Sequence, residues 1–310
     1  MDAITKARHK KIIFFHESIG DKIMDIVIYI FMIALLIATL FPFLNVIAVA
    51  FNKSSDSIKG GIGVFPRVPT IDNFKEITRY PLLLRGFYIS TLRTVAGTAA
   101  SLISTCMLAY SLSRRDYMFR GFITVLFLLT MYIDSGIIPH YMIIRLFGLN
   151  NNFLVYIIPG LISAYNLILV RSFIDQLPYS LQESAFLDGA NDFTIFSRIV
   201  MPLCLPVIAT IGLFYAVGQW NSWFDTFLYA PFNESITTLQ YELMKILQQS
   251  MSQSNAANLG QAARLSQTRN ISPISIRMAV TVVTVFPIIC VYPFVQRYFV
   301  AGVTLGAVKG

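Results

Sequence analysis

The run Ile26–Phe51 reads IVIYIFMIALLIATLFPFLNVIAVAF and contains no charged residue. A helix rises about 1.5 Å per residue, so roughly 20 apolar residues cross the hydrocarbon core of a bilayer, about 30 Å. This run is long enough to cross. It is also too long for the apolar core of a cleaved signal peptide, and no small-residue cleavage site follows it. We therefore expect it to remain in the protein as a membrane anchor.

The same pattern recurs along the rest of the chain. Five further runs carry at most one charged residue each: Tyr88–Tyr110, Gly121–Ile144, Phe153–Val170, Ile199–Phe224 and Met278–Gln296. None shows the alternation of apolar and polar residues that marks a membrane β-barrel. Because only helices and closed barrels satisfy the backbone in lipid, the sequence predicts an all-α polytopic membrane protein, with six transmembrane helices in residues 23–300.

Composition agrees with this class. Hydrophobic residues make up 55% of the 310 residues and charged residues 13%, against roughly 25% charged in a soluble domain. These values exclude a disordered chain, a disulfide scaffold and an ordinary cytosolic enzyme. The net charge of +8 indicates membrane lipid and not nucleic acid, because the basic residues cluster in the expected loops. The three cysteines and three histidines form no cluster with metal-ligand spacing, so no metal site is predicted.

Basic residues also predict the orientation, because cytoplasmic loops are enriched in lysine and arginine. They gather in the N-terminal segment 1–22 and in the loop containing Arg114, Arg115 and Arg120. Both regions then lie in the cytoplasm, and six crossings place the tail 301–310 there too. The loop Asn52–Gly86 would lie outside although it carries six basic residues. Longer loops count less in this rule.

Two connections between the runs are long. The outer segment 225–277 contains apolar residues at helical spacing in Thr237–Gln248, which predicts a helix there. The following stretch, Gln249–Asn270, is rich in Gln, Ser, Asn and Ala and is typical of a flexible or weakly helical connector. The inner loop 173–198 has more local order than a simple connection, and its sequence is the most informative in the chain.

The segment Leu181–Pro206 reads LQESAFLDGANDFTIFSRIVMPLCLP and predicts a helix–turn–helix. Ser180 with Glu183 matches a capping box at the start of the first helix. Gly189 can end that helix in the left-handed conformation. Asp192 is placed to cap the second helix. A stiff loop of this kind can present one face to a partner and transmit a displacement.

At these residues the chain resembles the EAA motif of bacterial ABC importer permeases. The resemblance rests on the pattern Glu-x-Ala-x-x-Asp-Gly-Ala followed by an isoleucine and by Pro-x-x-x-Pro, here with serine at the usual second alanine. It assigns contact with an ATPase subunit to Glu183, Ser184, Ala185, Asp188, Gly189, Ala190 and Pro202. The run Ser135–Pro139 and the ending Gly302–Gly310 resemble the carbohydrate-uptake branch, which is similar in plan to a maltose permease subunit.

The resemblance implies an importer of oligosaccharides in the bacterial plasma membrane with several further chains. These are a second homologous permease, two copies of a nucleotide-binding ATPase, and an extracytoplasmic sugar-binding protein. The sequence has no G-x-x-x-x-G-K-[ST] phosphate loop, so this chain is not expected to be an enzyme. It is expected to bind no cofactor, and the partner subunits would use ATP and Mg²⁺. The resemblance also implies that the tail contacts the ATPase pair, through Thr304, Gly306 and Lys309.

Two other function classes fit the sequence less well. A secondary sugar transporter or channel needs paired intramembrane charges or a filter motif, and six helices are few for a carrier. Only Arg93 and Asp134 lie deep in the runs, and we expect them to pair or to line the substrate path, the alternative being that Arg93 extends to the membrane interface. A membrane-embedded enzyme would need convergent catalytic groups, and none is present. Trp220 and Asn221 belong either to an interfacial aromatic belt or to a sugar-stacking platform.

Overall fold

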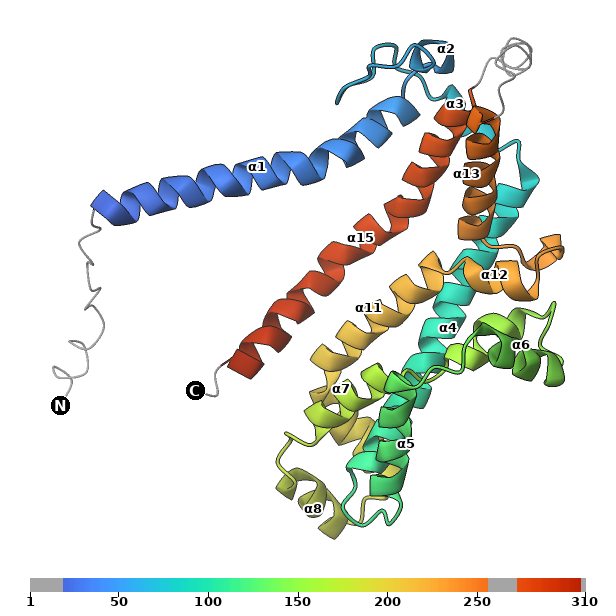
Figure 1. Cartoon of the computed structure of the whole chain (residues 1–310). Coiled ribbons are helices and arrows are strands. Elements are labelled where there is room, and N and C mark those ends of the chain that lie inside the picture. Colours follow the sequence, from blue (N-terminus) through green and yellow to red (C-terminus); the bar gives the residue numbers. More distant parts are fainter. Residues whose placement is uncertain (1–18, 256–271, 308–310) are drawn as a thin grey trace.

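The computed structural model describes residues 19–255 and 272–307 (Figure 1). Within these residues the regular secondary structure is helical, apart from one isolated β-bridge between Asn52 and Pro69. The expectation of an all-α protein is therefore confirmed. The N-terminal residues 1–18, which carry most of the basic residues of the predicted cytoplasmic segment, lie outside the described part.

Three helices are long and apolar enough to cross a membrane on their own. They are α1 (Ile19–Ala50), α4 (Pro81–Ser113) and α15 (Pro273–Ala307). They contain the first, second and sixth predicted runs, so these three runs are confirmed as continuous helices. Helix α1 can be apolar on every side over its length, since lipid tolerates apolar side chains all around a helix.

Two of the predicted runs are bent. The 3₁₀ segments η1 (Phe153–Tyr156) and η2 (Ile158–Gly160) meet α7 (Ala164–Ile174) at 48°. The stretch Asp192–Leu203 meets α11 (Leu205–Asn221) at 84°. Pro206, in the first turn of α11, lies at the sharper bend, where its missing N–H ends one helix and starts the next. Five candidate spans result if each bent pair crosses as one.

The prediction of one helix over Gly121–Ile144 is wrong. The structure has two shorter helices there, α5 (Arg120–Tyr132) and α6 (Ile137–Leu146). Gly136, between them, has a φ of 77°, which is incompatible with a continuous right-handed helix. The described residues thus hold three to five candidate spans by helix length and composition, where six continuous helices were expected.

The helices gather at two ends of the molecule (Figure 1). One end holds α2 (Ser54–Ser57), α3 (Asp72–Ile77) and the C-terminal end of α13 (Leu239–Asn255), which confirms the helix predicted in the outer segment. The other end holds α8 (Ser180–Leu187), from the inner loop, and the start of α5. Helix α1 leaves the body of the protein and packs on α15 near its own C-terminal end. The short helix α12 (Phe224–Tyr229) follows α11.

Each end has its own buried apolar cluster. At the α8 end, side chains of α4, α7 and α11 pack with those of the inner loop: Ala109, Leu112, Leu167, Val170, Ile174, Ile195, Val200, Cys204, Val207 and Ile211. At the other end, the tip of α1 packs with α3, α4, α11, α13 and α15 through Ala50, Ile77, Leu83, Trp220, Leu239, Ala279 and Val280. The inner loop is thus part of a core and not a free connection.

The contact of α4 with α13 depends on Gly86. A Cβ built there would lie 3.0 Å from the backbone N of Leu239, and that N–H donates to Ser90 Oγ at 2.9 Å. We expect Gly86→Ala to lower the stability of the purified transporter by about 1–3 kcal/mol, as overpacking does. Thermal unfolding in detergent measures this. Gly212→Ala, whose Cβ would make only an ordinary 3.4 Å contact with Leu102, is the control. Equal melting temperatures for the two variants would contradict this role of Gly86.

Candidate functional site

The inner-loop turn has the geometry that its glycine predicts. Gly189 has a φ of 84°, so the left-handed end of α8 is confirmed. The N–H of Ala190 donates to the carbonyl of Ala185 and the N–H of Gly189 to that of Phe186, both at 3.0 Å. These two bonds form a Schellman motif, which satisfies carbonyl groups that the last helical turn leaves unpaired. The turn therefore fixes the direction in which the chain leaves α8.

Both predicted N-caps of this loop are wrong by one residue. Helix α8 begins at Ser180, so Ser180 is inside the helix and Tyr179 holds the cap position without a side-chain bond. The second helix, α9 (Asp192–Ile195), is capped by Asn191, whose Oδ1 accepts from the N–H of Thr194 at 2.8 Å. After α9 the chain continues as a π-helical turn, η3 (Phe196–Val200), and α10 (Met201–Leu203). Such turns occur frequently at functional sites.

The carboxylate of Asp192 instead ties the inner loop to the end of α4. Arg114 contacts Asp192 at 3.3 Å and Asp116 at 3.2 Å. The hydrogen bond from Arg114 holds the pKa of Asp116 below its ordinary value, so this carboxylate stays charged. Arg115 places its guanidinium carbon 4.9 Å from the centre of the Tyr179 ring. From the sequence, Arg114 and Arg115 were predicted only to mark the cytoplasmic side, and their anchoring role was not predicted.

The outer face of α8 is exposed and apolar. Leu187 is 85% exposed and Phe186 64% exposed, while Glu183 lies beside them at the surface with Ser184 and Asp188. Ala185 and Ala190 face inward and pack on the core. Pro202 is exposed at the start of α10. The predicted coupling residues thus separate into an exposed face and an anchored face of one short element.

Arg93, a predicted substrate-path residue, is buried, and its partners differ from the expected one. Its side chain is 2% exposed and makes a bidentate contact with Asp225, at 2.6 and 3.2 Å. The same guanidinium donates twice to Gln219 Oε1, at 3.0 and 3.1 Å, and lies 4.4 Å from the ring centre of Tyr156. This arginine cluster, Arg93 with Tyr156, Gln219 and Asp225, joins α4 to η1, α11 and α12.

The expected pair of Arg93 with Asp134 is not formed. Asp134 is exposed in the break between α5 and α6, and its Oδ1 accepts from the N–H of Gly136 at 3.2 Å. It therefore helps to shape the turn that Gly136 makes. Asp225 was missed as a partner because it follows the fifth apolar run, although an acidic residue directly after a span is a signal that sequence analysis can use.

Trp220 and Asn221 differ in their exposure to solvent. Trp220 is 6% exposed, belongs to the second core, and donates from its indole nitrogen to the carbonyl of Thr284 at 2.9 Å. A sugar ring stacking on it would first have to displace these neighbours. Asn221 is exposed at the end of α11 and accepts from the Gln240 amide at 3.2 Å. Of the two, only Asn221 offers a polar group at the surface.

The tail is helical where the structure describes it. Helix α15 continues through Ala307, so Thr304 and Gly306 lie in its last turns. Lys309 lies outside the described residues. The proposed contact of the tail with an ATPase subunit would therefore be made by the end of a helix.

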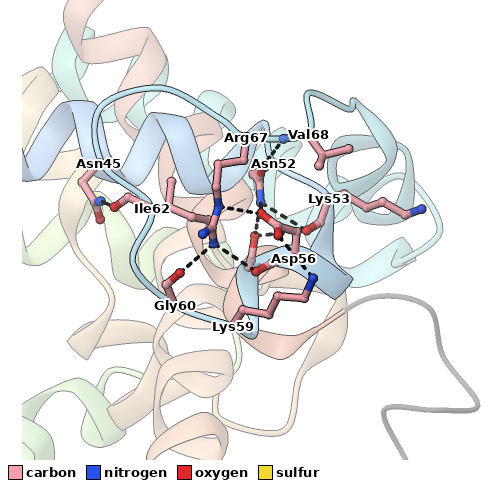
Figure 2. A network of polar contacts seen from close by, with 10 residues as sticks. Asn45, Asn52, Lys53, Asp56, Lys59, Gly60, Ile62, Arg67 and Val68 are labelled. Carbon is pink, nitrogen blue, oxygen red and sulfur yellow. Dashed lines mark hydrogen bonds and ion pairs between the residues drawn. The ribbon is translucent and has the colours of Figure 1, made fainter.

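The outer loop after α1 is held by a polar network (Figure 2). Fully buried Asn52 donates to Asp56 Oδ2 at 3.1 Å and to Ser57 Oγ at 3.0 Å, and accepts from the N–H of Val68 at 2.7 Å. Arg67 donates from Nε to Asp56 Oδ2 at 2.9 Å and from Nη2 to the carbonyl of Gly60 at 2.6 Å. One asparagine and one ion pair thus fold the glycine-rich loop back onto the end of α1.

This network predicts an acid-sensitive loop. The hydrogen bond from Asn52, with the nearby Arg67 charge, holds the pKa of Asp56 below its ordinary value of 3.8. A depressed pKa stabilises the fold above the ordinary value, and the contribution is lost as pH falls below it. We expect hydrogen-exchange protection of the Val68 amide to be flat from neutral pH to about pH 5 and to fall below about pH 4.

The Asp56→Asn variant should lack this acid step. Asp72→Asn, which removes an exposed carboxylate of α3, should keep it. A loss of protection that begins near pH 6, or an unchanged acid step in Asp56→Asn, would show that another group controls the loop.

Comparison with solved structures identifies the fold. A chain of a bacterial ABC transporter involved in the import of the acidic polysaccharide alginate superposes with a TM-score of 0.83 and 27% sequence identity, over 91% of this chain and 98% of that one. A second chain, from the bacterial alginate ABC transporter in complex with alginate pentasaccharide-bound periplasmic protein, matches with a TM-score of 0.54 and 15% identity. The fold is that of an ABC importer permease.

Sequence comparison identifies the relatives. The polygalacturonan/rhamnogalacturonan transport system permease protein YtcP of Bacillus subtilis is 35% identical over 293 residues, which cover 94% of this chain and 99% of the relative. Protein LplC of the same organism is 34% identical over 300 residues, 95% and 98% of the two chains. The arabinooligosaccharides transport system permease protein AraQ of Halalkalibacterium halodurans is 28% identical, over 87% and 91%. No family model matches the sequence.

The chain therefore belongs to the family of permease subunits of bacterial ABC importers for carbohydrates. It is an integral membrane component of an oligosaccharide importer. The resemblance that the inner loop carries in the sequence is confirmed, and it extends over nearly the whole chain.

Proposed function

We propose that this chain is one of two homologous permeases that together enclose the path of an oligosaccharide, with two ATPase subunits bound on the cytoplasmic side. The observation that carries the proposal is the α8 face. Leu187 and Phe186 are exposed there on an element that the core holds rigidly from behind. Exposed apolar groups on a stiff support fit a partner protein that must push on them. Glu183 is placed to meet a basic group of that partner.

The second permease is supported by α1. This helix leaves the body of the chain, and its side chains are apolar and exposed over most of its length (Figure 1). We propose that a homologous permease covers part of this surface and lipid the rest. The α5–α6 pair would complete the third crossing against that partner. Six crossings with both termini in the cytoplasm would then place α8 inside and the network of Figure 2 outside, where the extracytoplasmic binding protein docks.

The proposed substrate is an oligosaccharide that contains acidic sugars. Support comes from two relatives, whose names include polygalacturonan and the acidic polysaccharide alginate. ATP and Mg²⁺ would be used by the ATPase subunits, and this chain would bind neither. The sugar would pass from the binding protein into the cavity between the permeases when the ATPase subunits close, and hydrolysis would reset the transporter.

The test is made on the complete complex in nanodiscs. The rate of ATP hydrolysis is measured with the binding protein loaded from a panel of acidic and neutral glycans. Stimulation by an acidic oligosaccharide above the unloaded binding protein is the expected result. Stimulation by neutral glycans alone would overturn the substrate class. Uptake that persists after ATP depletion with the ion gradient intact would overturn the ATP-driven mechanism and favour a secondary transporter.

The helical tail is proposed to reach the ATPase pair and respond to its closure. Removing residues 304–310 shortens none of the candidate spans, since the candidate span within α15 is Ile274–Val291. We expect this deletion to leave assembly intact and to lower sugar-stimulated ATP hydrolysis severalfold. A deletion of residues 308–310 alone keeps all of α15 and separates the contribution of Lys309 from that of the helix end. Full stimulated activity after removal of 304–310 would show that the tail has no part in coupling.

A further inference from the structure

The α8 end of the protein contains a pocket of about 520 Å³. Its walls come from four elements: the end of α4, the start of α5, the end of α7, and α8. Three arginines line it, Arg115, Arg120 and Arg171, together with one acidic residue, Asp175. A pocket with this excess of positive charge favours an anion, and guanidinium groups match the geometry of phosphate oxygens.

Two buried polar atoms in this pocket lack hydrogen-bond partners. Arg171 Nε donates no hydrogen bond. It forms an ion pair with Asp175 Oδ2, but the 3.6 Å between the two atoms is too long for a hydrogen bond. Gln182 Oε1 is an acceptor with no donor, on a side chain that is 6% exposed. Buried polar groups are normally satisfied, so an unpaired donor and an unpaired acceptor in one pocket point to a ligand that carries both functions. A phosphate oxygen and a neighbouring hydroxyl meet this requirement.

The surface beside the pocket is apolar. Val125 lines the pocket from α5. Phe122 and Leu129, one turn to either side of it on the same helix face, are exposed with it. A free phosphate or a nucleotide gains nothing from such a surface, whereas the acyl chains of a lipid do. The ligand that fits both parts is an amphiphile with an anionic head.

We propose that this pocket binds the phosphate group of an anionic phospholipid of the inner leaflet, with a headgroup hydroxyl donating to Gln182. The inference rests on the proposed function only in placing α8 on the cytoplasmic side. Tyr179, which Arg115 covers, and Gln182 belong to the start of the α8 region. A bound lipid therefore touches the same helix that is proposed to meet the ATPase, and it would hold the rear of that helix in place.

The probe is palmitoyl-oleoyl phosphatidylglycerol, added to the delipidated complete complex in detergent and counted by native mass spectrometry. The wild type should retain more phosphatidylglycerol than the Arg115→Gln/Arg120→Gln variant, with at least a tenfold change in apparent Kd for one site. Arg85→Gln/Arg145→Gln removes two exposed arginines elsewhere and should bind as the wild type does. Arg115→Lys/Arg120→Lys should recover most of the binding, since the charge remains.

Four results would overturn the proposal. These are equal retention by the glutamine variant, equal retention of palmitoyl-oleoyl phosphatidylcholine, displacement of the lipid by millimolar inorganic phosphate, and binding seen only after the ATPase subunits are removed. The third would indicate a site for a free anion, and the fourth a site that a partner protein covers. Lipid counting does not depend on transport, so failure here leaves the sugar-stimulated ATPase result unaffected, and the reverse also holds.

Discussion

Gly189→Val is expected to abolish sugar uptake and to weaken retention of the ATPase subunits during purification. The reason is strain in the backbone and not a lack of room for the side chain. A Cβ at this position would meet nothing within 4 Å, but φ is 84°. A β-branched residue is a severe outlier in that conformation, and even alanine loses roughly 1 kcal/mol or more there. The chain would relieve the strain by breaking the two Schellman bonds, and α8 would lose its fixed direction.

The matched control is Gly189→Asn, because asparagine tolerates the left-handed conformation far better than valine does. It should keep most of the uptake and most of the bound ATPase. The measurements are substrate uptake in cells, and the ratio of ATPase to permease after affinity purification. Wild-type values of both in Gly189→Val would refute the coupling role of this turn. Equal loss in the asparagine variant would mean that the glycine is needed for close contact with the partner and not for its conformation.

The inner loop shows how far local sequence signals reach. The glycine turn was predictable because a helix that ends at a glycine commonly does so with that glycine in the left-handed conformation. The N-caps were each misplaced by one residue, for a different reason in each helix. The N–H of Gln182 bonds to the carbonyl of Tyr179, which starts the helix before the serine can cap it. Asn191 precedes Asp192 and takes the cap position.

The membrane region shows what hydropathy cannot detect. A run of apolar residues predicts burial in lipid, but it does not register a break such as the one at Gly136, where hydropathy stays high on both sides. The partner of Arg93 was also not predicted. Asp134 was the only other charge inside a run, whereas Asp225 lies 132 residues away along the chain and just past the end of a run. The packing of α4 on α11 and α12 places Arg93 beside Asp225.

Asp225→Ala is expected to destabilise the assembled transporter by about 3–5 kcal/mol, because it leaves the buried Arg93 without its carboxylate. Arg93→Met should cost less. The Asp225 side chain is 21% exposed and keeps a hydrogen bond from the N–H of Thr226 at 2.9 Å, so its charge is still solvated and hydrogen-bonded when Arg93 is removed. The double variant Arg93→Met/Asp225→Asn should be more stable than Asp225→Ala alone, since no unpaired buried charge remains.

Thermal unfolding of the purified complex, followed by loss of the assembled peak on size exclusion, measures these differences. Arg85→Met removes an exposed arginine from the same helix and should be near neutral. Asp134→Asn tests the pairing that the sequence suggested and should also be near neutral, since the amide oxygen can still accept from Gly136. If Asp134→Asn destabilised the complex as much as Asp225→Ala, Arg93 would be paired with Asp134 in the working transporter. If Asp225→Ala behaved like Arg85→Met, the arginine cluster would not hold α4 to α11 and α12. The expected order, with Asp225→Ala the least stable, follows from where each charge is buried.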